Sequence, residues 1–177
     1  MSQHDLSAWL VEHGFPPDND EATVANGTTP LMKASHTGNA AAVQALIHRG
    51  APLNTRNADG NNALWLACVG KSAQIMQTLI DAGIDMNNRN DNGATCLMYA
   101  ASNGSVAVLE QLIAAGADLR PETLDGFSAL DMASTLECLN VLRRAVASAT
   151  STAMAPTPPA EITAVTPGST TERGAPC

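Results

Sequence analysis

The chain has 177 residues, of which 17 are acidic and 9 are Lys or Arg, so its formal net charge at pH 7 is −8. Holding a nucleic acid requires many basic side chains to displace counterions, so this composition argues against a nucleic-acid partner and disfavours an anionic membrane surface. Hydrophobic residues make up 45% of the chain but aromatic residues only 3%. The core must therefore consist mainly of aliphatic side chains, which favours closely packed helices in one domain.

The start of the sequence predicts a cytoplasmic protein. Residues 1–14 include acidic side chains and lack the basic start and continuous apolar stretch of a secretory signal. No apolar run reaches the length of about 18 residues that a membrane-spanning helix needs. The four cysteines, Cys68, Cys96, Cys138 and Cys177, include no close pair. This spacing favours reduced thiols over disulfides or a zinc site, and we expect neither a metal nor another cofactor.

A period of 33 residues dominates the sequence from residue 24 onward. Three of its columns are Gly27, Gly60, Gly93 and Gly126; Leu31, Leu64, Leu97 and Leu130; and Ala34, Ala67, Ala100 and Ala133. Within the first unit, apolar residues recur at helical spacing over residues 31–36 and again over residues 40–47. Gly38 stands between these two segments and Gly50 follows the second, at positions where helices commonly end. We therefore predict two helices in every unit.

One feature of the second unit bears on this prediction. Lys71 stands where other units have the glycine between the helices, and Gly70 comes one residue earlier. Because that turn favours a left-handed backbone, we expect its conformation to be altered in this unit.

Met32, Trp65 and Met98 form another column with the same period. A repeating apolar column of this kind is more typical of a core than of a binding site.

The units resemble ankyrin repeats, which consist of a β-turn and two helices in 33 residues and carry a T-P-L-H-x-A signature. The matching segments are residues 29–34, 62–67, 95–100 and 128–133, although the signature histidine is absent from all four. The resemblance implies an all-α ankyrin-repeat solenoid of about four units with β-turn fingers. The expected repeats are residues 24–56, 57–89, 90–122 and 123–147.

The two ends of the solenoid are expected to be irregular, because the outer faces of terminal repeats must be closed off from water. Residues 1–23 look like an N-terminal cap, in which residues 5–14 form the second helix of a half-repeat. The fourth unit lacks the terminal glycine. Residues 148–177 are rich in Ala, Thr, Pro and Ser. With so few large apolar side chains they cannot offset the entropy cost of ordering, and we predict a disordered tail after the domain at residues 1–147.

The sequence offers no convincing catalytic or metal-binding group. His36 and Cys68 are the nearest base and nucleophile that the repeat permits, but Cys68 lies in a column of small residues. That column favours a packing role for the thiol over catalysis. The four histidines share no helix face and have no cysteine at ligand spacing. We expect the chain not to be an enzyme.

Ankyrin repeats bind partner proteins on a concave face, chiefly through residues beside the turn glycine and near the end of the first helix. The resemblance therefore implies protein-binding residues at Leu66, Val69, Tyr99, Ser102, Asn103, Leu124, Phe127, His36, Asp59, Asn61, Asp91 and Asp125. The apolar members would form an exposed patch with Tyr99 near its centre. Alternatively, Leu66 and Met132 are tucked between helices and Phe127 packs on the last repeat. The three Asp residues are either an acidic stripe for a basic partner segment or simply good turn formers.

These features predict a monomeric module that binds a cytosolic partner protein, and the bound part of the partner would be a basic or apolar segment. The alternative is a regulator or inhibitor subunit that blocks or scaffolds an enzyme, with the tail contributing to binding. Thr157 and Thr166, each followed by proline, would be the contact or phosphorylation points in such a tail.

Overall fold

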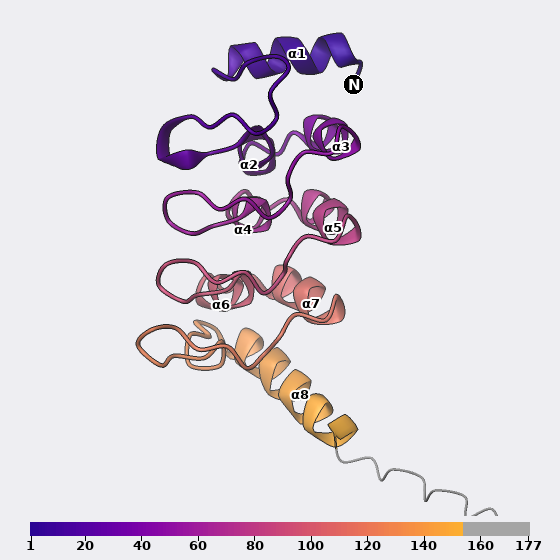
Figure 1. Cartoon of the computed structure of the whole chain (residues 1–177). Helices are drawn as coiled ribbons and strands as arrows, with labels where there is room; N and C mark the ends of the chain where they lie inside the picture. Colours follow the sequence, from indigo (N-terminus) through magenta and orange to yellow (C-terminus); the bar gives the residue numbers. More distant parts are fainter. Residues whose placement is uncertain (154–177) are drawn as a thin grey trace, which may run out of the picture.

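The computed structural model describes residues 1–153, with side chains as far as residue 149, and it shows layers of helices stacked in one direction (Figure 1). A helix and a short 3-10 turn come first, α1 (Gln3–Glu12) and η1 (Ala25–Gly27). Three helix pairs follow, α2 (Pro30–His36) with α3 (Ala40–His48), α4 (Ala63–Val69) with α5 (Ala73–Asp81), and α6 (Cys96–Ser102) with α7 (Val106–Ala114). The last helix is α8 (Leu136–Ala153). The predicted all-α repeat fold is confirmed.

The first helix of each pair begins at the same kind of cap. The side chains of Thr29, Asn62 and Thr95 accept hydrogen bonds from the backbone N–H groups three residues later, at 3.3, 3.1 and 3.4 Å. These bonds satisfy donors that the start of a helix leaves unpaired. The first residue of the repeat signature therefore fixes where the helix begins.

The repeating apolar columns form one continuous core through the layers. Leu31, Leu64 and Leu97 on the first helices are at most 2% exposed, and the alanines three residues after them are fully buried. Alanine at these positions lets neighbouring helices approach closely, as the aliphatic composition requires. At the N-terminal end, α1 packs against α3 and buries Leu6 and Leu10.

The turns between repeats project as fingers to one side of the helices (Figure 1). Backbone hydrogen bonds of 3.0 Å join successive fingers, from Ala58 N–H to Asn26 C=O and from Asp91 N–H to Asp59 C=O. Arginine side chains add a second link. Arg56 donates to the carbonyl of Arg89 at 2.9 Å, and Arg89 donates to that of Glu122 at 2.6 Å. The fingers are thus held in register.

The turn between α4 and α5 keeps the backbone of its neighbours, so the expected alteration at Lys71 is wrong. Lys71 has a φ of +55°, close to the +75° of Gly38 and the +68° of Gly104. The following residue, Ser72, donates its N–H to the carbonyl of Ala67 at 3.2 Å, just as Asn39 does to Ala34 at 3.0 Å. A lysine therefore occupies a left-handed position.

The fourth unit has only one helix, which corrects the prediction of two helices in every unit. Residues 128–132 form a single turn, with Met132 N–H bonded to Ser128 C=O at 3.1 Å. Glu137 replaces the glycine between helices, and Thr135 caps α8 instead, accepting from Cys138 N–H at 3.2 Å. Helix α8 consequently begins at Leu136, three residues before the position equivalent to Ala40, and leaves no room for a full first helix.

The last helix also extends further than the change in composition indicated. α8 ends at Ala153, so residues 148–153, which were assigned to the disordered tail, are helical. The rest of the predicted tail, with Thr157 and Thr166, lies outside the described residues. Within the part of the chain that the structure describes, no helix is both long enough and apolar enough to cross a bilayer.

Candidate functional site

Two open hollows adjoin each other between the fingers and the first helices. The larger, here called the Tyr99 groove, has a volume of about 490 Å³ and is lined by Trp65, Asn90, Asn92, Ala94, Tyr99, Ser102, Thr123, Asp125, Phe127 and Met132. The smaller, the Leu66 groove, has a volume of about 300 Å³ and is lined by Asn26, Thr28, Lys33, His36, Asn57, Asp59, Asn61, Trp65, Leu66 and Val69. Trp65 lines both, so the two grooves are neighbours that share this side chain as part of their walls.

An aromatic pair stands where the two grooves meet. The ring centroids of Trp65 and Tyr99 are 5.2 Å apart, with an angle of 45° between the ring planes. Trp65 is half-buried, whereas Met32 and Met98 in the same column are 1% exposed. The methionines of this column are therefore core residues as predicted, whereas Trp65 packs against the core and also lines the grooves. The larger side chain reaches past the core to the surface, and its size was the signal that sequence reasoning passed over.

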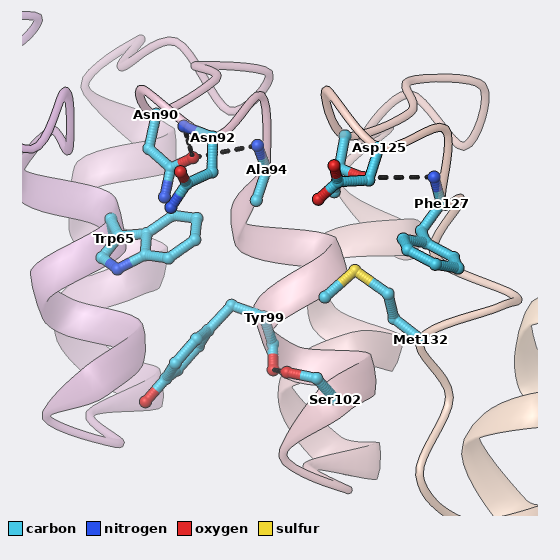
Figure 2. A pocket seen from close by; sticks show the side chains of 10 residues that line it. Trp65, Asn90, Asn92, Ala94, Tyr99, Ser102, Asp125, Phe127 and Met132 are labelled. Atoms are coloured by element: carbon cyan, nitrogen blue, oxygen red, sulfur yellow. Dashed lines mark hydrogen bonds between the residues drawn. The ribbon is translucent and has the colours of Figure 1, made fainter.

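The opposite side of the Tyr99 groove is formed by the fourth unit. Figure 2 shows Asp125, Phe127 and Met132 across the hollow from Trp65 and Tyr99. Phe127 is 53% exposed, and its N–H donates to the side chain of Thr123 at 3.1 Å. On the same finger Leu124 is 75% exposed.

The apolar candidates divide between the two interpretations considered for them. Phe127 and Leu124 are exposed, as a binding patch requires, and Phe127 is not packed away on the last repeat. The other apolar candidates are half-buried while still lining the grooves, namely Leu66, Val69, Tyr99 and Met132. A half-buried side chain of this kind offers a contact surface that is already ordered.

The three turn aspartates differ in what they contact. Asp59 accepts hydrogen bonds from the side chains of Asn26, at 2.7 Å, and Asn57, at 3.3 Å. Asp91 pairs with Arg56 at 3.2 Å. Among the described residues, nothing pairs with the Asp125 carboxylate, which lines the Tyr99 groove. The three aspartates therefore differ in how much of their negative charge is free to meet a partner.

The remaining polar candidates are also divided. His36 and Asn61 line the Leu66 groove, and Ser102 lines the Tyr99 groove with its hydroxyl donating to Tyr99 C=O at 2.9 Å. Three candidates line neither groove, namely Asn103, Asp91 and the apolar Leu124.

The buried cysteines have the environment of packing residues. Cys68 is 3% exposed, and burial raises the pKa of its thiol to about 12. Burial also raises the pKa of Cys96 well above its ordinary value. His36, the base considered for Cys68, is exposed. Within residues 1–153, no three His, Cys, Asp or Glu side chains are placed to hold a metal ion.

Comparison with known proteins agrees with the architecture. A family model described as ankyrin repeats (3 copies) matches residues 2–90 and 70–151. No curated protein matches the chain. Ankyrin repeats are generally protein–protein interaction modules and are typically non-enzymatic. Because the matches extend over most of the sequence, the chain belongs to the ankyrin-repeat family.

Proposed function

We propose that this chain is a non-catalytic module that holds a segment of a cytosolic partner protein in the Tyr99 and Leu66 grooves. The side-by-side position of the two grooves, which share Trp65 as a lining residue, carries the proposal. Together they cross successive layers of the stack, so an extended segment can contact several repeats at once. The buried free thiols of Cys68, Cys96 and Cys138 are consistent with a reducing compartment.

The groove surface has aromatic side chains that are held in place and polar groups that are free to form hydrogen bonds with a partner. Trp65 and Tyr99 offer ring surface that is already held in place by their mutual contact. Their indole N–H and phenol O–H, like the side-chain amide of Asn92, bond to no other described residue. Aromatic side chains with an apolar body and a polar tip are favoured as anchors in protein interfaces. The arrangement therefore suits a peptide that brings both apolar contacts and hydrogen bonds.

A double substitution tests the proposal. The intact chain and the Tyr99→Ala/Phe127→Ala variant are used as baits in a soluble extract of the source cells, and bound proteins are identified by mass spectrometry. For a purified partner, we expect the variant to lose about 1 to 3 kcal/mol of binding free energy. The matched control is Gln74→Ala/Glu110→Ala, which changes two exposed residues on α5 and α7 outside both grooves. Equal binding by all three baits would contradict the proposal.

Removing the tail separates the two predicted binding regions. A chain that ends at Ala153 retains every residue that lines the grooves. If the grooves carry the binding, this shortened chain should have the affinity of the intact one. A large loss would instead assign the partner contact to residues 154–177.

A further inference from the structure

The distribution of charge in the Tyr99 groove indicates what kind of side chain it accepts. Asp125 is the one lining residue with a formal charge at neutral pH, and its carboxylate bonds to no other described residue. The Leu66 groove differs, because it contains the cationic Lys33 together with Asp59, whose carboxylate already accepts two hydrogen bonds. An excess of negative charge is therefore confined to the Tyr99 groove.

The rings beside Asp125 reinforce this preference. Trp65 and Tyr99 stand on one side of the hollow and Phe127 on the other, next to Asp125 (Figure 2). The faces of aromatic rings carry partial negative charge and attract cations, most strongly where the cation is partly shielded from water. The aromatic rings and the unpaired carboxylate line one hollow of about 490 Å³, and both kinds of group attract cations.

We propose that the Tyr99 groove accepts a Lys or Arg side chain from an extended segment of the partner, with its cationic end paired to the Asp125 carboxylate. This inference rests on the proposed function and narrows it to one partner chemistry. The alkyl part of the basic side chain lies against the rings of Trp65, Tyr99 and Phe127 while its charge stays at the carboxylate. The net charge of −8 attracts such a segment at a distance.

Other side chains fit this groove less well. An acidic residue would be repelled by Asp125. An apolar residue would cover the Asp125 carboxylate without pairing it, and a desolvated charge without a partner is costly. A basic residue avoids both penalties.

Peptide selection tests the inference directly, because it needs no purified partner. A phage-displayed library of random linear dodecapeptides is selected on the full chain. We expect the enriched sequences to share Lys or Arg at one position. The consensus peptide is then synthesised with Lys or with norleucine there, and both are titrated by fluorescence anisotropy. The intact chain should bind the Lys peptide about tenfold more tightly, since a partly shielded cation beside rings and a carboxylate gains on that order.

Two variants assign that preference to Asp125. Asn stands at the equivalent position of the preceding finger, Asn92, so Asp125→Asn should leave the turn intact. It should lose most of the tenfold preference for Lys over norleucine. Glu110→Gln removes the same charge from an exposed position on α7 outside the grooves, and it should keep the preference.

The outcomes separate this inference from the proposed function. Enriched peptides without a basic residue, or an unchanged Lys preference in Asp125→Asn, would overturn the inference, and so would a library that yields no binder. The proposed function survives those results if the Tyr99→Ala/Phe127→Ala variant still loses its natural partner. If the selected peptides bind that double variant as well as the intact chain, the groove is not the site and both fail.

Discussion

The carbonyl oxygen of His36 lies so close to Gly70 that a Cβ added to this glycine would stand 2.7 Å from it. Gly70 follows α4 directly and has a φ of −70°, an ordinary helical value. The glycine is therefore required by the close approach of two layers, and the left-handed conformation of the turn belongs to the next residue, Lys71.

This contact predicts that Gly70→Ala destabilises the stack by about 1 to 3 kcal/mol, because the added methyl group must push α2 and α4 apart. Urea unfolding followed by circular dichroism measures the loss. Asn103 occupies the equivalent position of the third unit and already carries a Cβ. We expect Asn103→Ala to change stability little. A similar loss of stability at both positions would contradict the prediction that the close contact at Gly70 causes the loss.

The left-handed backbone of Lys71 predicts that replacing this residue by glycine stabilises the protein. A left-handed backbone with φ of +55° costs a residue with a Cβ about 1 to 2 kcal/mol. Glycine relieves this strain, but it also loses more conformational entropy on folding than lysine does, and this offsets part of the gain. Lys71→Gly should therefore raise the free energy of unfolding by about 0.5 to 1 kcal/mol, as urea unfolding would measure.

The reverse substitution is the control for Lys71. Gly38 has a φ of +75°, and nothing lies within 4 Å of an added Cβ. Gly38→Lys should thus lower stability through backbone strain alone and by a similar amount. A decrease in stability for Lys71→Gly would mean that the lysine makes a favourable contact that outweighs its strain.

Gly70 and Lys71 show where prediction from the sequence ends. The helix pairs could be predicted because caps such as Thr29 and core residues such as Leu31 act within their own unit. Gly70 could not be interpreted in that way, because the reason for the glycine is an atom of the preceding layer. The backbone of Lys71 follows from the turn that all the helix pairs share, and the identity of its side chain gave the wrong expectation.

The single helix of the fourth unit was missed because its cap has no counterpart in the other units. Thr135 starts α8 by accepting a hydrogen bond from Cys138 N–H. The residues at the same position of the earlier units are His36, Val69 and Ser102. These three end the first helices of their units, so nothing in their column predicts a cap.

The binding face was predictable in part. Repeat position alone indicated that Tyr99 and Phe127 lie beside the fingers. It could not indicate that Asp125 is the unpaired aspartate, because Asp59 is bonded by Asn26, 33 residues away, and Asp91 by Arg56, 35 residues away. Such pairings depend on how one finger lies over the next, which no single unit specifies.

The hydrogen bonds that Arg89 makes between fingers should contribute more to stability than the exposed ion pair of Arg56 and Asp91. Arg89 donates to the carbonyls of Gly93, at 3.2 Å, and Glu122, at 2.6 Å. Losing these bonds in Arg89→Ala should cost about 1 to 2 kcal/mol, because they join two fingers. The exposed pair of Arg56 and Asp91 is screened by water, so Asp91→Asn should cost less than about 0.5 kcal/mol. Equal costs in urea unfolding would contradict this ranking.

The buried thiols predict how stability depends on pH. Burial raises the pKa of Cys68 from its ordinary 9.0 to about 12. As the pH rises above 9.0, the unfolded chain therefore loses this proton before the folded chain does, and ionisation favours unfolding. The contribution of Cys68 to stability is complete below pH 9.0 and is lost as the pH rises toward 12. Cys96, whose pKa is also raised by burial, acts in the same direction.

Two measurements check this dependence. The free energy of unfolding should fall above about pH 9, and the fall should be smaller in Cys68→Ala, a substitution that Ala101 at the equivalent position of the third unit indicates is tolerated. At about pH 8 a thiol with a pKa of about 12 is ionised in only about one molecule in ten thousand. Iodoacetamide should consequently leave Cys68 unmodified in the folded protein and modify it in urea, as peptide mass spectrometry would show. Rapid modification of Cys68 without urea would mean that α4 opens to solvent far more often than its burial indicates, because only an exposed thiol regains its ordinary pKa.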